Sequence, residues 1–192
     1  MRNKSRAFVA LLVVLASAGA AAKPQSYRHD EYGFEVRMPE GAARCAPDKY
    51  SVDDGELFYL DKSHIDCRTI DYHEERTISI NGVPNGSNDT GEPDTLDGYY
   101  QQYCELNDGC TGEHPKLSIA GQAVRTGQTK GNNGRLDIFV LYQHGENPHF
   151  KGKHLKANNI AVVLSTDAAH EAGDLKALKQ LLATLRIYNE PH

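Results

Sequence analysis

Three histidines spaced five residues apart come nearest to a metal site in this sequence: His144, His149 and His154. Neutral imidazoles are good ligands for transition metals. A five-residue step matches neither one face of a helix nor one face of a strand, so only a loop could gather them. Gly145 and Gly152 favour such a loop. We favour solvated loop histidines, and the sequence predicts no metal and no cofactor.

The same predicted loop carries a basic tip with one aromatic side chain: Phe150, Lys151, Lys153 and Lys156. Such a tip could contact an anionic surface such as lipid headgroups or a cell-wall polymer. The alternative, which we favour, is that the lysines keep an exposed loop soluble.

Known catalytic motifs are missing from the sequence. It contains no Gly-x-Ser-x-Gly nucleophile motif and no phosphate-cradling or dinucleotide-binding glycine pattern. The polar stretch 85–94 offers oxygen ligands but lacks the spacing of a calcium-binding EF-hand loop. The sequence therefore assigns no catalytic residue, and a hydrolase or metal-dependent enzyme of unrecognised type remains the alternative.

The four cysteines are Cys45, Cys67, Cys104 and Cys110. An even number in an exported chain favours two disulfides, and three pairings are possible. We favour Cys45 with Cys67 and Cys104 with Cys110, because neighbours in the sequence close small loops. The turn-rich residues 105–109 would let the second bridge hold the end of a helix.

The N-terminus resembles a cleavable signal peptide. Arg2, Lys4 and Arg6 precede an apolar stretch at 7–16 and small residues at 17–22. The apolar stretch is shorter than the roughly 20 residues of a membrane-spanning helix. We expect cleavage after Ala22, with Ala20 as the alternative. We therefore expect one exported domain, residues 23–192, secreted or, given the bacterial style of the signal, periplasmic.

Charge is unevenly distributed along the chain. Residues 23–115 hold 20 acidic and 8 basic residues, whereas residues 116–192 hold 6 acidic and 10 basic ones. An acidic face could bind a basic partner. The alternative, which we favour, is that the two halves interleave and neutralise each other. The overall acidity argues against nucleic acid binding.

Hydrophobic periodicity predicts strands separated by two helices. The predicted strands are 27–29, 32–38, 55–60, 68–72, 76–80, 120–129, 135–142 and 159–166. We expect a loop at 81–93, a hairpin turn at 130–134, a helix from 94 or 95 to 106, and a closing helix at 168–187 with a possible break near Gly173. In the first helix, Leu96, Tyr99, Tyr100, Tyr103 and Leu106 form one apolar face.

The start at 32–41 and the closing segment Leu181–Ile187 resemble the PsbP-like α/β/α sandwich group. The matching positions are structural, so the resemblance implies a fold and no function. The pattern as a whole predicts an α+β protein with a mostly antiparallel β-meander, packed by a short mid-chain helix and a C-terminal helix. The function we favour is that of an exported, non-catalytic binding protein, such as an inhibitor or immunity protein for a basic protein partner.

Overall fold

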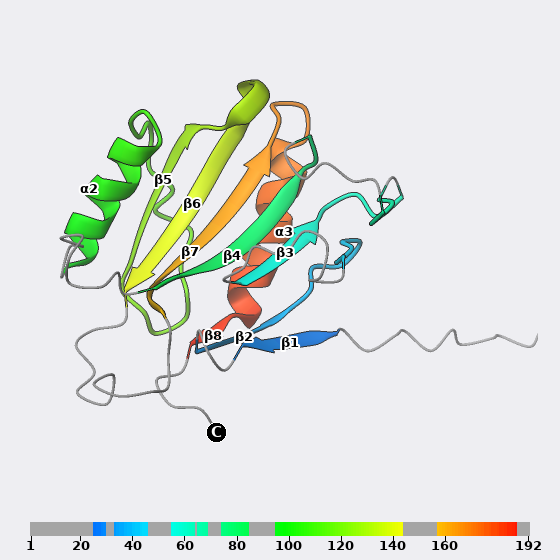
Figure 1. The fold of residues 1–192 in the computed structure, drawn as a ribbon, viewed down its shortest axis with the longest axis horizontal. Helices are drawn as coiled ribbons and strands as arrows, with labels where there is room; N and C mark the ends of the chain where they lie inside the picture. Colours follow the sequence, from blue (N-terminus) through cyan, green and yellow to red (C-terminus); the bar gives the residue numbers. More distant parts are fainter. Residues whose placement is uncertain are drawn as a thin grey trace, which may run out of the picture.

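The computed structural model describes residues 25–29, 33–45, 55–63, 65–68, 74–84, 95–143 and 157–187. Within these ranges, eight strands form two antiparallel sheets, and two α-helices pack against them (Figure 1). The predicted α+β class, with β-structure predominant, is confirmed. The predicted signal peptide and the loop predicted at 144–156 lie outside the described residues.

The larger sheet has five strands in the order β3-β4-β7-β6-β5. Their bounds are Gly55–Tyr59 (β3), Thr77–Pro84 (β4), Val124–Lys130 (β5), Leu136–Gln143 (β6) and Ala157–Thr166 (β7). The acidic half of the chain supplies β3 and β4, and the basic half supplies β5, β6 and β7. The two halves therefore lie side by side in this sheet and meet where β4 pairs with β7.

The smaller sheet has three strands in the order β1-β2-β8. Their bounds are Ser26–His29 (β1), Phe34–Arg37 (β2) and Arg186–Ile187 (β8). The first two form the predicted opening hairpin, with Ser26 opposite Arg37 and His29 opposite Phe34. The smaller sheet therefore joins the start of the described chain to its end.

The two helices cover opposite faces of the larger sheet. Helix α2 is Leu96–Leu106, and helix α3 is Glu171–Thr184. Figure 1 shows α3 passing behind the strands, while α2 lies across from it beside β5. No helix in the described part of the chain is both long and apolar enough to cross a membrane.

Strand β6 explains why both faces are covered. Because side chains alternate along a strand, Ile138 and Val140 belong to the core beneath α3, and Phe139 and Leu141 belong to the core beneath α2. All four are fully buried. On the α2 side, Gly127 of β5 makes room for the Phe139 ring, since a Cβ there would lie 2.6 Å from Phe139 Cζ.

Two predicted elements, the closing helix and the strand predicted from 120, need correction. The closing helix ends at Thr184, because Leu185 takes extended backbone angles and the next two residues pair with β2 as β8. The helix has no break at Gly173. The strand predicted from 120 begins only at Val124, since the chain turns at Gly121 with φ +74°.

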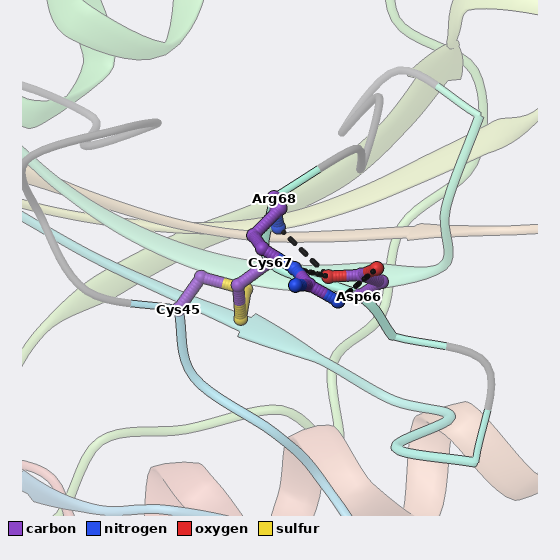
Figure 2. Close-up of a disulfide and its surroundings, with 4 residues drawn as sticks. All are labelled: Cys45, Asp66, Cys67 and Arg68. Atoms are coloured by element: carbon purple, nitrogen blue, oxygen red, sulfur yellow. Dashed lines mark hydrogen bonds and ion pairs between the residues drawn. A yellow bond between two sulfur atoms is a disulfide. The ribbon is translucent and has the colours of Figure 1, made fainter.

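Two further predictions are revised in part. Residues 81–84, expected to be loop, belong to β4, which pairs with β7 up to Pro84 with a shift of register between Val83 and Pro84. Of the strand predicted at 68–72, the structure describes only Arg68, which lies in a turn. Asp66 accepts hydrogen bonds from the backbone and the side chain of Arg68 (Figure 2). These local bonds favour the turn over a strand.

A buried polar network ties α3 to the sheet. Asp174, in the first turn of α3, accepts a hydrogen bond from Arg76 at 2.7 Å and one from Thr166 at 2.6 Å. The side chain of Asp174 is 8% exposed and that of Arg76 is 17% exposed. Arg76 also lies 3.8 Å from Asp61. Because the interacting groups are shielded from water, removing one partner leaves an uncompensated charge.

We predict that Arg76→Met lowers the free energy of unfolding by about 3 kcal/mol, because it leaves the buried Asp174 carboxylate without its cation. Arg68→Met is the matched control, since its ion pair with Asp66 is exposed and should not affect stability measurably. Urea denaturation of both variants checks this. Equal losses in the two variants would contradict the prediction.

Candidate functional site

The two disulfides follow the pairing favoured from the sequence. Cys45 is bonded to Cys67 (Figure 2), and Cys104 is bonded to Cys110. Their Cα–Cα distances are 5.4 and 5.0 Å, within the usual range for a disulfide. The first bridge links the segment before β3 to the segment after it. The second closes the turn that follows α2.

Helix α2 is held by its cap and by aromatic packing. Thr95 caps the helix by accepting a hydrogen bond from the Gly98 backbone N–H at 3.1 Å. Tyr99 is buried, and the ring of Tyr103 lies 4.6 Å from that of Phe139. Burial and the nearby Asp137 carboxylate raise the pKa of Tyr103 well above its usual value, so the phenol stays neutral. These tyrosines are packing residues, as predicted.

Leu106 corrects the predicted apolar face of this helix. The sequence places Leu106 among the buried residues, but the structure leaves it 78% exposed. It is the only large hydrophobic residue exposed in the described part of the chain. Cys104 and Cys110 pack against the core at this end of the helix instead. The disulfide turns the chain back toward β5 and leaves Leu106 facing solvent.

The turn that carries Leu106 has a defined backbone. Asn107 donates through its side-chain amide to the Tyr103 carbonyl at 2.7 Å, and the Gly109 N–H donates to the Cys104 carbonyl at 2.7 Å. Asp108 and Gly109 both have positive φ, a conformation that Gly and Asp tolerate well. Beyond the disulfide, the Thr111 N–H donates to the Gln128 carbonyl of β5. The turn is therefore held from both sides.

The charged residues that lie nearest Leu106 along the chain are acidic. Glu105, Asp108 and Glu113 are exposed, and no ion pair within the described ranges neutralises them. Acids are unfavourable at the C-terminal end of a helix, where the dipole is negative, and α2 has no basic residue in its last turn. We call Leu106 together with these three acids the acidic tip. The stability of α2 therefore does not explain why acidic residues occur at this end of the helix.

Sequence reasoning missed the acidic tip, although one signal was available. Asn107, Asp108 and Gly109 are strong turn residues, so the helix had to end directly after Leu106. A residue at the last helical position, one turn beyond Tyr103, has less of the sheet beneath it. This signal favours exposure of Leu106.

A second cluster of titratable groups joins the two sheets. Glu56 of β3, only 3% exposed, lies 2.5 Å from His29 Nε2 of β1 and 2.5 Å from Arg44 Nε. Arg44 also donates through a second nitrogen at 2.9 Å and stacks over the Tyr27 ring. Sequence reasoning missed this cluster. Strand alternation could have found it, because Glu56 shares a face with the buried Phe58.

The Glu56 cluster is a closed ion pair with no sign of an exposed reactive group. Burial by itself raises the pKa of Glu56, but the hydrogen bonds from His29 and Arg44 and the Arg44 charge together lower it below its usual value. The carboxylate is therefore held ionised. We assign this cluster to the stability of the junction between the sheets.

The other residues singled out from the sequence cannot be placed. His144, His149 and His154 lie outside the described residues, as do Phe150, Lys151, Lys153 and Lys156, so the predictions about them stay open. Within the described ranges, no three His, Cys, Asp or Glu side chains gather as a metal site would require.

Comparison with solved structures gives a similarity of fold. No protein-family model matches this chain, and no curated protein matches it. The solution structure of cyanobacterial PsbP (CyanoP) from Synechocystis sp. PCC 6803 is similar to it, with a TM-score of 0.49 and 16% sequence identity. The similarity covers 88% of this chain and 96% of that chain. The weak PsbP-like resemblance in fold pattern is thereby confirmed.

We predict that replacing both Cys104 and Cys110 with Ala costs about 2 kcal/mol of stability, because the bridge closes a short loop in the unfolded chain. Amide hydrogen exchange should accelerate at residues 105–110 and remain slow in β6 and β7. Uniformly faster exchange throughout the sheet would contradict a local role for this bridge.

We predict that the Glu56 cluster makes stability depend on acid pH. Because the pKa of Glu56 is lower in the folded state than its unfolded value of about 4.3, its contribution is complete above that value. It is lost as the pH falls through the folded pKa. Glu56→Gln should be less stable at pH 7 and should show a flatter decline below about pH 4.3, by at most about 1.4 kcal/mol per pH unit.

Chemical denaturation between pH 3 and 7 measures this slope. Asp66→Asn is the control, because the Asp66 carboxylate is exposed and its ion pair with Arg68 lies at the surface. A Glu56→Gln slope identical to that of the unmodified protein would show that the cluster does not carry the acid sensitivity.

Proposed function

We propose that this chain is an exported, non-catalytic protein that binds a basic protein partner through the acidic tip, in the manner of an inhibitor or immunity protein. The observation that carries the proposal is the 78% exposure of Leu106 among three acidic residues without ion-pair partners in the described structure. An apolar anchor with a polar rim is the arrangement of a protein-binding hot spot.

The electrostatics of the tip support a basic partner. Glu105, in the last turn of α2, and Asp108, two residues after the helix ends, add their charges to the negative end of the α2 dipole. A concentrated negative potential speeds encounter with a positively charged surface and disfavours acidic proteins. Burial of Leu106 on binding would then add apolar stabilisation of roughly 1.5–3 kcal/mol.

The rigidity of the tip also supports binding. The Cys104–Cys110 bridge, the Asn107 side-chain bond to Tyr103 and the Thr111 bond to β5 hold the turn in one conformation. A preorganised surface loses little conformational entropy when it binds. The same contacts would keep Leu106 from collapsing onto the protein's own surface.

Export is supported by the predicted signal peptide and by the two disulfides. Structural disulfides persist in oxidising compartments and are rare in the cytosol. The predicted cleavage after Ala22 is part of this proposal, and N-terminal sequencing of the purified protein tests it. A secreted and a periplasmic location are both compatible with these features.

No described feature favours the enzyme alternative. The histidine with the closest carboxylate contact, His29, shares its partner Glu56 with Arg44 inside a closed junction.

We predict that the protein, purified from the expressing cell and immobilised, captures one stoichiometric basic protein from the native envelope fraction. Leu106→Ala and the charge reversal Glu105→Lys/Glu113→Lys should each weaken capture about tenfold or more, since each removes part of the anchor or its rim. Quantitative mass spectrometry of the eluates, followed by affinity measurement with the isolated partner, checks this.

The matched control is Glu40→Lys/Glu171→Lys, which changes the net charge equally but at residues away from the tip. It should retain the partner. Equal loss of binding in both charge reversals would indicate a general charge effect and contradict a specific tip. Capture of no protein by the unmodified chain would also contradict the proposal.

A further inference from the structure

A surface groove of about 540 Å³ lies at the junction of the smaller sheet and α3, near the C-terminal end of that helix. Its walls come from distant parts of the chain. They comprise Gln25, the segment Arg37–Ala42, Lys62, Gln180 and Thr184. The volume suits a small organic molecule.

The groove belongs to the α3 side of the molecule. Leu178, Leu181 and Leu182 anchor α3 in the core on one face of the larger sheet, whereas α2 and the acidic tip pack on the other face. A ligand in the groove would therefore be separate from a protein bound at the tip. The inference below does not depend on the proposed function.

Backbone hydrogen bonds fix the walls of the groove. The Arg37 N–H donates to Thr184 Oγ1 at 3.1 Å, which joins the end of β2 to the end of α3. The Met38 N–H donates to the Gln25 carbonyl at 3.1 Å. A turn between Pro39 and Ala42 is closed by an N–H to carbonyl bond of 3.2 Å and has Gly41 at φ +82°. The groove is thus preformed.

The charge balance of the groove differs from that of the acidic chain as a whole. Two exposed cations, Arg37 and Lys62, line it, and neither forms an ion pair within the described structure. One carboxylate, that of Glu40, lines it as well. Lys176 lies one helical turn before Gln180 on the same face of α3 and is exposed, so it extends the positive surface.

The amide and apolar side chains that line the groove further restrict the kind of ligand that it can bind. The amides of Gln25 and Gln180 offer further hydrogen-bond donors beside the two cations. Met38, Pro39 and Ala42 contribute apolar surface, and the last two are buried. Carboxylate groups match the cations, and an aliphatic body matches the apolar surface.

We propose that this groove binds a small organic anion with more than one carboxylate group and an aliphatic body. Arg37 and Lys62 bind the carboxylates, and the Met38–Ala42 segment contacts the hydrocarbon. Arg37 is suited to a bidentate contact with one carboxylate, whereas Lys62 acts as a point charge. Glu40 disfavours ligands that carry their charge at its end of the groove.

The test is a titration of the isotope-labelled protein, as purified from the expressing cell, with azelate, a linear aliphatic dicarboxylate. Backbone amide shifts provide the readout. We expect saturable shifts confined to the lining segments, at Met38, Gly41, Ala42 and Thr184. Arg37→Gln and Lys62→Gln should each weaken binding about tenfold, the effect of losing one charge-assisted hydrogen bond.

Two controls make the result decisive. Lys179 is an exposed cation of α3 that does not line the groove. The Lys179→Gln variant should therefore bind azelate with the same affinity as the unmodified protein. Inorganic phosphate, an anion without an aliphatic body, should bind at least about tenfold more weakly than azelate.

Three outcomes would overturn the proposal. They are the absence of saturable azelate binding up to about 10 mM, an affinity loss in Lys179→Gln equal to that in Arg37→Gln, and phosphate binding as tight as azelate binding. Arg37→Gln retains the backbone bond to Thr184, so a preserved amide spectrum would show that weakened binding does not come from unfolding.

Discussion

The arrangement of this molecule depends on the apolar side chains of β6, which are buried on both faces of the larger sheet. Ile138 and Val140 point to one side, and Phe139 and Leu141 point to the other. A strand of this kind is stable only when both faces are shielded from water, since each such side chain contributes roughly 1.5–3 kcal/mol when buried. Helix α3 covers one face and α2 covers the other. The layered structure follows from that requirement.

Two polar networks then determine how the layers meet. Asp174, held by Arg76 and Thr166, attaches the start of α3 to β4 and β7. Glu56, held by Arg44 and His29, attaches the smaller sheet to the edge strand β3. Both carboxylates are buried, so each needs its cation close by and in a defined direction. Apolar contacts alone would not fix the position of α3 and of the smaller sheet relative to the larger sheet, and these two polar networks do so.

The same layering separates the surface charges. The acidic and basic halves of the chain meet at the β4–β7 pair and are joined by ion pairs such as Arg76 with Asp174 and Arg125 with Asp97. The charges that remain unpaired still differ between the two sides. Glu105 and Asp108 flank the exposed Leu106 at the end of α2, whereas two cations, Arg37 and Lys62, and one carboxylate, that of Glu40, line the groove beside α3. The molecule therefore presents two chemically different surfaces on opposite sides of one sheet.

The α+β class, the central strands and the start of α2 follow from the sequence alone, because strand alternation and helix capping are local properties. The sequence favoured one disulfide pairing of three, and the structure selected it. Features that depend on contacts between distant segments could not be predicted locally. Leu106 follows the helical pattern of its neighbours, yet the Cys104–Cys110 bridge takes its place against the core. Residues 186–187 continue an apparently helical segment, but β2 offers them a strand partner. The Glu56 cluster and the groove each need three or more segments to meet, and no local pattern encodes such a meeting.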